Sequence, residues 1–437
     1  MNSPTDVQQR IPPVHRIFIA ALVMDLAIAT IGLGVQLLGN DLGASPSMLG
    51  WLGTIGALAY TIGCLFSGGL SDRFGRRLLV SFSCGACGVV WLTMTQAGSA
   101  LQLLAILPFS GASISLFWPP VQAWMSEITV GGRDRLNQNI GGFNIAWTIG
   151  LMLGPVVAGL AWDIDRYLPA LTEAARRAGI AENLGRYAPF VLAAIGAFAM
   201  LALVRTIPRR VSGGGEPAPE DRDAVRPHGD VTSRFLHLAW IANFASWFGR
   251  ALNIVIFTKI ATTMGLSGST IGVTVAMFLA GQLIMFLYLR NRSGWQYKLW
   301  PLLAALGAAS GAWVLAWFAW SPWVFGVAFA IAGVGAGVTY VSSLYYSLDG
   351  QAVSRGAMAG IHEAVLGSGV FLGPLAGGYV AEQATRYLPE TLALRIPYLL
   401  SAAVFVLIGV TVYVAWRQMM QNMERNHAAD RIGVTGE

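Results

Sequence analysis

Twelve long apolar segments constrain this chain more than any other feature of its sequence. Each is about 20 residues long, the length of helix that crosses the ~30 Å hydrocarbon core of a bilayer. Backbone polar groups inside lipid have to bond within the segment, so we predict that all twelve are α-helices. They cover approximately residues 15–38, 48–67, 77–97, 100–123, 138–161, 187–207, 235–260, 269–290, 297–319, 322–346, 357–381 and 396–417.

Composition agrees with a polytopic integral membrane protein. Of the 437 residues, 55% are hydrophobic and 11% are charged, whereas soluble chains carry about 25% charged residues. We therefore expect the inner or plasma membrane of the cell as its location and lipid as its surroundings. The net charge of +6 does not indicate a nucleic-acid partner, because the arginines lie at the ends of the spans. The first fourteen residues are too polar to start a cleavable signal peptide.

Charge and composition also divide the chain. Residues 208–233 combine glycine, proline and mixed charges and predict a flexible linker. Most of the 28 Lys and Arg residues lie on the side of the membrane that would hold both termini, which makes that side cytoplasmic. The predicted parts are a cytoplasmic N-terminal segment 1–14, a six-helix bundle 15–207, the cytoplasmic linker 208–233, a second six-helix bundle 234–417 and a cytoplasmic tail 418–437.

The two halves repeat each other. Residues 42–50 resemble residues 264–272, and Gly154-Pro155 resembles Gly373-Pro374. This pattern predicts two pseudo-symmetric six-helix bundles. The loop 162–186 is longer than a plain turn, and residues 171–178 predict a short surface helix there.

The segment Gly68–Arg77 reads G-x-x-x-D-R-x-G-R-R between two apolar spans. It resembles the cytoplasmic loop between helices 2 and 3 of the major facilitator superfamily. The alternative is an ordinary membrane turn whose arginines only set orientation. The resemblance implies an all-α polytopic membrane protein with 12 transmembrane helices in two pseudo-symmetric bundles, a small-molecule substrate bound between them, and no cofactor.

The same resemblance implies a cytoplasmic gate. Asp72 would accept hydrogen bonds from the N-terminal end of the eleventh span and from nearby arginines, where the helix dipole favours a carboxylate. The residues implied in this gate are Gly68, Asp72, Arg73, Gly75, Arg76, Arg77, Glu127 and Arg135, with Arg133 as an alternative to Arg135.

The fifth and eleventh spans carry small residues at helical spacing. Gly150, Gly154, Pro155 and Gly159 resemble the G-x-x-x-G-P motif of drug:proton antiporters, and Gly369, Gly373, Pro374 and Gly377 are their twins in the second half. Small residues let two helices touch, so these spans could rock against neighbours during transport. Plain close packing without any bias to export would leave the same glycines.

Asp25 lies inside the first span, where a charged side chain costs about 2.5–3.5 kcal/mol or more. It shares a helical face with Gln36 and could line a cavity and exchange protons. Alternatively, a structural partner such as Arg250 neutralises it. His362 and Glu363 are a second candidate for proton coupling, or for a cytoplasmic gate.

Polar and aromatic residues suggest a cavity lining. Arg250 could bind a carboxylate or phosphate through its planar guanidinium, or could instead pair with Asp25. The aromatics could equally be lipid-facing or core residues. The candidates are Gln36, Tyr60, Trp118, Asn243, Trp247, Arg250, Asn253, Gln282 and Tyr340. Cys84 and Cys87 form a C-x-x-C pair, which we attribute to helix packing in preference to a metal site.

We therefore expect a secondary transporter, a monomer driven by the proton gradient, that exports a lipophilic or cationic compound. Two departures from the family pattern weigh against the antiporter type: residues 290–295 lack the aspartate of the first-half motif, and Leu107 stands where such antiporters carry arginine. The alternatives are uptake or uniport of an organic anion or sugar-like solute bound by Arg250, and a non-transporting receptor or scaffold. No nucleophile–base set, metal cluster or nucleotide-binding loop in the sequence predicts an enzyme.

Overall fold

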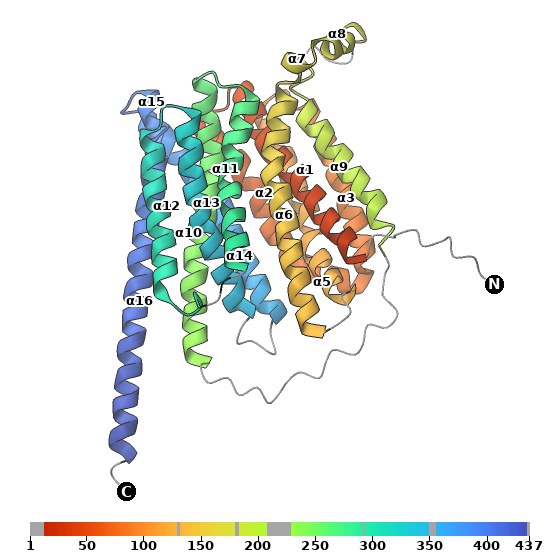
Figure 1. The fold of residues 1–437 in the computed structure, drawn as a ribbon. Coiled ribbons are helices and arrows are strands. Elements are labelled where there is room, and N and C mark those ends of the chain that lie inside the picture. The colour runs from red at the N-terminus through yellow and green to blue at the C-terminus, as the bar shows by residue number, and fades with distance from the viewer. Residues whose placement is uncertain are drawn as a thin grey trace, which may run out of the picture. The chain divides into compact units, whose positions relative to one another are not determined.

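The computed structural model describes residues 13–128, 132–179, 183–207, 229–290, 292, 294–348 and 355–434. Within these ranges every regular element is a helix (Figure 1). In the first part of the chain the helices are α1 Pro13–Asp41, α2 Pro46–Phe74, α3 Arg76–Thr93, the 3-10 turn η1 Met94–Gln96, α4 Ala100–Ser115, α5 Trp118–Ile128, α6 Gly132–Trp162, α7 Ile164–Tyr167, α8 Pro169–Arg177 and α9 Ala188–Val204. In the second part they are α10 Gly229–Thr263, α11 Gly268–Arg290, α12 Leu299–Phe318, α13 Pro322–Leu348, α14 Arg355–Thr385, α15 Glu390–Ala393 and α16 Ile396–Val434.

Ten of the described helices are long and apolar enough to cross a membrane. The two expected spans outside this set are α9 and α10. The apolar helix α9 has 17 residues, and α10 has 35 residues but carries Asn243, Arg250 and Lys259, which lower its mean hydropathy. The part of the chain that the structure describes is therefore all-helical with ten membrane-spanning candidates, and the count of twelve in two six-helix bundles stays a prediction.

The chain forms two compact units. They are divided within the predicted linker, and each also includes one short segment from the other half of the chain. Unit 1 comprises Met1–Ala44, Ile55–Glu220 and Gly265–Ala276, and unit 2 comprises Ser45–Thr54, Asp221–Met264 and Met277–Glu437. The first turns of α2 therefore belong to unit 2, and the first turns of α11 belong to unit 1. Each of these two helices passes from one unit to the other along its length.

In unit 1, α6 packs closely along α1. A Cβ atom at Gly150 would overlap the carbonyl oxygen of Leu22, and one at Gly154 would lie 2.6 Å from that of Leu26. Increasing numbers on α6 thus meet increasing numbers on α1, so the two helices run parallel. Thr30 adds a hydrogen bond from its Oγ1 to the carbonyl of Gly154 at 3.1 Å. Such close backbone approach is the packing that small residues permit in membrane helices.

Unit 2 repeats the arrangement with α14 against α10. A Cβ at Gly369 would lie 2.8 Å from the carbonyl oxygen of Phe244, and one at Gly377 would lie 2.6 Å from Leu252 Cγ. These helices also run parallel. Aromatic rings from α12, α13 and α16 fill the rest of the interior of unit 2. Trp313 is stacked on Tyr398 there, with 6.2 Å between the ring centroids.

Turn chemistry sets several helix ends. Gly75 adopts φ 92°, a conformation that residues with a Cβ avoid, and it alone separates α2 from α3. Ser99 caps α4 by accepting the backbone N–H of Gln102, whose side chain accepts the N–H of Gly98 at 2.8 Å. This pair resembles a capping box, except that the Gln102 side chain bonds the residue before the cap and not the cap residue itself.

Three segments differ from, or test, the sequence-based expectations. The fourth span remains one membrane-spanning candidate, Ala100–Met125, but its helix breaks into α4 and α5. Pro119 and Pro120 have no N–H group to bond the carbonyls of Ser115 and Leu116, as a continuous helix would require. The helix α16 extends through the polar tail predicted at 418–437 as far as Val434, because no Gly or Pro follows Arg417 until Gly433. The short helix expected at 171–178 is confirmed as α8, which projects with α7 from the end of α6 (Figure 1).

The close contact of α14 with α10 predicts a stability effect. Gly373→Ala would press a methyl group onto the carbonyl of Phe248 and the backbone N of Leu252, so we expect a loss of about 1–3 kcal/mol of unfolding free energy. Gly311→Ala is the matched control, because no atom lies within 4 Å of a Cβ at that position. Thermal unfolding in detergent should show a lower Tm for the first variant only. Equal Tm values for both variants would mean that the contact is not needed.

Candidate functional site

Unit 2 gathers aromatic and polar side chains from four helices around His362 of α14. The imidazole is 1% exposed, and its Nδ1 lies 2.7 Å from Ser343 Oγ of α13. Tyr340 of α13 meets the imidazole edge-on at 5.2 Å and also contacts Trp247 of α10 and Phe286 of α11 at 6.4 and 5.3 Å between ring centroids. We refer to these five residues as the His362 cluster.

A positive charge adjoins this cluster. The guanidinium carbon of Arg250 lies 5.0 Å from the centre of the Trp247 ring, and the arginine is partly buried. Such cation–π contacts contribute about 0.5–2 kcal/mol, with the larger values where water is excluded. A guanidinium is the side-chain group that binds a carboxylate or phosphate by two parallel hydrogen bonds, and this contact places one beside the His362 cluster.

Buried polar groups in unit 2 have unused hydrogen-bonding capacity within the described residues. Asn243 is fully buried, and neither its Oδ1 nor its Nδ2 has a hydrogen-bond partner there. The same holds for Nε2 of Gln282 and Nε2 of His362. A buried donor or acceptor left unpaired costs about 1–3 kcal/mol. Asn243 lies one helical turn before Trp247, and Gln282 lies one turn before Phe286, so both flank the His362 cluster.

The other unit 2 candidates have structural contacts. Asn253 is buried and accepts a hydrogen bond from Tyr398 Oη at 3.3 Å through its Oδ1, which ties it to the aromatic interior. Glu363 follows His362 and is partly buried.

In unit 1, Asp25 lies near the middle of α1 and is 7% exposed. The backbone of α6 approaches α1 closely at Leu22 and Leu26, which precede and follow Asp25 in the sequence. Gln36, further along α1, is 2% exposed. The polar residues predicted on α1 are thus buried in unit 1 within an apolar helix. The predicted pairing of Asp25 with Arg250 joins residues of different units and stays a prediction.

Two aromatic candidates also lie in unit 1. Tyr60 is partly buried on α2, and Trp118 is partly buried at the start of α5. The indole of Trp118 packs edge-on against Phe143 of α6 at 6.0 Å. This contact gives Trp118 a packing role between α5 and α6.

The turn between α2 and α3 is held by its own arginines. Arg76 forms an ion pair with Asp72 and donates to Ser71 Oγ. Arg77 donates to the carbonyl of Arg205 at the end of α9, where unpaired helix carbonyls accept cationic donors.

The remaining gate residues divide into described and undescribed ones. The guanidinium carbon of Arg73 lies 5.4 Å from the centre of the Phe74 ring, and no atom lies within 4 Å of a Cβ placed at Gly68. Glu127 and Arg135 stand in α5 and α6, but their side chains lie outside the described residues. The predicted bond from Asp72 to the start of the eleventh span joins different units and stays a prediction.

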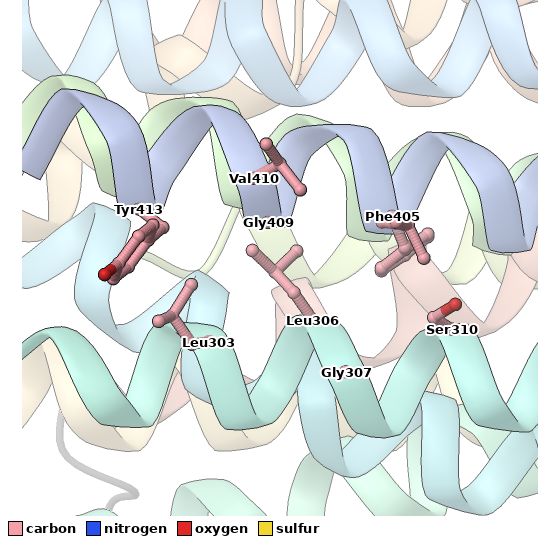
Figure 2. A pocket seen from close by; sticks show the side chains of 9 residues that line it. Leu303, Leu306, Gly307, Ser310, Phe405, Gly409, Val410 and Tyr413 are labelled. Atoms are coloured by element: carbon pink, nitrogen blue, oxygen red, sulfur yellow. The ribbon is translucent and has the colours of Figure 1, made fainter.

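A groove of about 260 Å³ in unit 2 lies between α12 and α16 (Figure 2). Gly307 and Gly409 leave space between the helices, and apolar side chains such as Leu306 line it. Its Ser310 donates to the carbonyl of Ala402 at 3.1 Å, and Val410 is 55% exposed at its edge. The residues that line the groove include no charged group, so we do not take it as the candidate site.

Sequence reasoning missed Phe286 and Ser343, because neither residue type is unusual in a membrane helix. The signal for Phe286 was its spacing of four from Gln282, which places both on one face of α11. Ser343 stands three residues after Tyr340, again on one helical face. The described residues contain no group of three or more His, Cys, Asp or Glu side chains that could hold a metal ion.

These observations define a class: a polytopic helical membrane protein with buried charged and amide side chains in its interior, an organisation typical of membrane transporters. Residues 17–351 match the Major Facilitator Superfamily. The chain belongs to that superfamily.

The curated relatives are similar over short stretches. An uncharacterized MFS-type transporter of Methanocaldococcus jannaschii is 26% identical over 151 residues, which is 35% of this chain and 39% of the relative. The niacin transporter NiaP of Acinetobacter baylyi is 32% identical over 91 residues, or 18% of this chain and 21% of the relative. Synaptic vesicle glycoprotein 2A of Rattus norvegicus is 29% identical over 151 residues, which is 32% of this chain and 19% of the relative. The matches therefore span less than half of each relative.

Solved structures are similar over nearly the whole chain. An inward-facing bacterial homolog of the human lysosomal transporter Spinster has a TM-score of 0.71 at 16% identity and covers 94% of this chain and 97% of its own. A proton-dependent oligopeptide transporter has a TM-score of 0.68 at 15% identity, and the match covers 92% of this chain and 98% of that transporter. The nucleoside transporter NupG has a TM-score of 0.64 at 12% identity, and the match covers 93% of this chain and 99% of NupG. At these identities the likeness shows the fold.

Proposed function

We propose that this membrane transporter is a secondary active transporter of the drug:proton antiporter type. It works by alternating access and uses the proton gradient to export a lipophilic or cationic compound across the inner or plasma membrane, as a monomer with both termini cytoplasmic. The observation that carries this proposal is Asp25, a carboxylate 7% exposed in the middle of the apolar helix α1. An acid at this depth is costly unless it pairs, lines a cavity or takes up a proton.

Coupling follows from competition for that carboxylate. A cationic compound is stabilised by the ionised form of Asp25, and a proton arriving from the other side of the membrane neutralises it and releases the compound. Each ligand shifts the transporter only by its differential affinity for the two states. Glu363 and His362 are further groups for the proton path.

A second candidate function is uptake or uniport of an organic anion or sugar-like solute bound by Arg250. The specific observation in its favour is the Arg250–Trp247 contact beside the His362 cluster. One matched relative is named a niacin transporter, so niacin belongs in the set of solutes to be tested.

The test uses inside-out vesicles that hold an acid-inside pH gradient reported by a fluorescent dye. Lipophilic cations, niacin, other organic anions and sugars are added in turn, with vesicles lacking the protein as the blank. Collapse of the gradient by a cation supports the first function. Uptake of a labelled anion without any proton movement would contradict it and support the second, and movement of none of these solutes would contradict both.

A further inference from the structure

The groove between α12 and α16 is open along its length because glycines form its floor. A Cβ atom at Gly307 would meet no atom within 4 Å, and one at Gly409 would meet only Cβ of Leu306, at 4.0 Å. Val406 and Val410 are each 55% exposed along its edge. Both helices belong to unit 2. The groove therefore has room for a long apolar chain between two helices that already pack on each other.

One end of this groove is the end at which α12 begins. Leu306 meets Gly409, and Ser310 donates to the carbonyl of Ala402, so increasing numbers on α12 meet decreasing numbers on α16 and the helices run antiparallel. Figure 2 shows the ring of Tyr413 at this end of the groove, beside Leu303 of α12.

Two basic residues lie just beyond the Tyr413 end. Lys298 directly precedes α12, and Arg417 follows Tyr413 by one turn of α16. At 1.5 Å of helix rise per residue, each lies roughly 6–8 Å past the level of Leu303 and Tyr413. Because the helices are antiparallel, both displacements point the same way, and the two bases stand at the same end of the groove.

A buried cluster in unit 2 holds the residues next to both bases. Tyr297, which precedes Lys298, and Trp416, which precedes Arg417, pack against the same core group, made up of Phe235, Leu236, Ala239, Tyr346 and Met419. Tyr297 also donates its backbone N–H to Tyr346 Oη at 2.7 Å and adopts φ 55°, a value that is uncommon for a residue with a Cβ atom. The packing thus fixes the chain beside each base at one place in the unit.

The positive charge at this end is not balanced by acids on the same helices. Lys298 and Arg417 are exposed, and neither α12 nor residues 396–422 of α16 contain Asp or Glu. Trp300 in the first turn of α12 is 64% exposed, and Tyr413 is 44% exposed. Amphipathic aromatic side chains of this kind lie at the level of the lipid headgroups, which is the level at which the phosphate of a phospholipid is found.

We propose that this groove and its two bases form a binding site for a phospholipid with an anionic headgroup. One acyl chain lies between α12 and α16, and Lys298 and Arg417 bind the phosphate, the arginine by two parallel hydrogen bonds. The Tyr413 hydroxyl donates to the same headgroup. Basic pockets between membrane helices on the cytoplasmic side favour anionic lipids, and the charge distribution of the sequence predicts that this end is cytoplasmic.

Charge also decides between a lipid and a second copy of the chain. Two copies in one membrane that met at this groove about a two-fold axis would bring the same ends together, so the bases of one copy would face those of the other. An anionic lipid pairs with them instead. The proposal requires only that the chain lies in a membrane, and it is independent of the substrate and of proton coupling through Asp25.

Native mass spectrometry of the full chain in detergent tests the site. Phosphatidylglycerol and phosphatidylcholine with identical acyl chains are titrated in turn, and the dissociation constant of the first bound lipid is measured. Phosphatidylglycerol should bind at least about tenfold more tightly, because each basic residue near a headgroup contributes about fivefold. Lys298→Gln/Arg417→Gln should lower its affinity to that of phosphatidylcholine. Gly307→Leu should weaken both lipids, because its side chain fills the groove.

Arg290→Gln/Arg292→Gln is the matched control. It removes two exposed positive charges at the end of α11, which a short loop joins to α12, so the change in charge is the same but lies outside the groove. The preference for phosphatidylglycerol should persist in this variant, and its loss there would overturn the proposal in favour of a general attraction. Equal affinities of the two lipids for the parent protein would overturn it as well.

The groove variant tests the position of the acyl chain. Lipid binding that is unchanged in Gly307→Leu would overturn the proposal, as would a dimer of the parent protein that this substitution dissociates, since the occupant would then be a second copy. The Tm of each variant in phosphatidylcholine should match that of the parent. If Gly307→Leu does not fold, Gly409→Leu fills the same groove from α16 and is held to the same outcomes.

Discussion

Asp25→Asn is expected to lower proton-coupled transport at least about 100-fold, a change of about 2.7 kcal/mol in the free energy of the coupled step. Asparagine keeps the size and hydrogen-bonding capacity of the side chain, but it cannot ionise or carry a proton. In acid-inside inside-out vesicles, a cation that collapses the gradient through the parent protein should leave it intact in the variant. Binding of an uncharged analogue of that cation should persist, because the variant removes only the charge.

Asp41→Asn is the control for this experiment. It makes the same substitution in the same helix, but its carboxyl group is 47% exposed and pairs with Arg186. An exposed ion pair contributes only about 0–1 kcal/mol, so transport should stay within a few-fold of the parent value. If Asp25→Asn still exchanges cations for protons at the parent rate, Asp25 does not couple, and Glu363 and His362 are the groups to test next.

Arg250→Ala is expected to abolish transport of an organic anion, by about 100-fold or more, and to spare cation export. The alanine removes the only positive charge described beside the His362 cluster. It also removes the guanidinium N–H groups that would donate hydrogen bonds to an anion. Arg250→Lys keeps the charge but loses the planar, two-pronged geometry, so we expect it to recover part of the activity. Uptake of labelled niacin and of benzoate into vesicles measures both variants.

The control is Arg292→Ala. Arg292 also lies over an aromatic ring, 5.2 Å from the centre of Tyr288, but it is exposed. The substitution therefore removes the same kind of contact outside the candidate site. Equal loss of anion uptake in both arginine variants would indicate a general effect of charge, and unchanged uptake in Arg250→Ala would rule out the second function.

The sequence predicted the helical class because apolar length is a direct requirement of the bilayer. The helix predicted over 235–260 is present as α10. It is not among the ten membrane-spanning candidates because Asn243, Arg250 and Lys259 reduce its hydropathy, so its status as a span stays a prediction. The break between α4 and α5 was missed because hydropathy does not respond to Pro119 and Pro120, although the effect of proline on the preceding residues could have predicted it.

The candidate site was partly predictable for a similar reason. Asp25 and Arg250 stood out because charge is rare inside a span. Phe286 and Ser343 did not, because neither residue type is unusual in a membrane helix. Their contacts with Tyr340 and His362 join different helices, and these become neighbours only on folding.

The passage of α2 between the two compact units also has a consequence for how the protein is made. Thr54 of α2 donates to the carbonyl of Phe371, 317 residues later in the chain, and Glu382 reaches Ser45 across 337 residues. At about 5–20 residues per second, a ribosome adds that length in roughly 15–60 s. During this interval the start of α2 is already in the membrane without its helix partner, so we expect the new helix to stay exposed to the insertion machinery and to quality-control proteases until α14 is made.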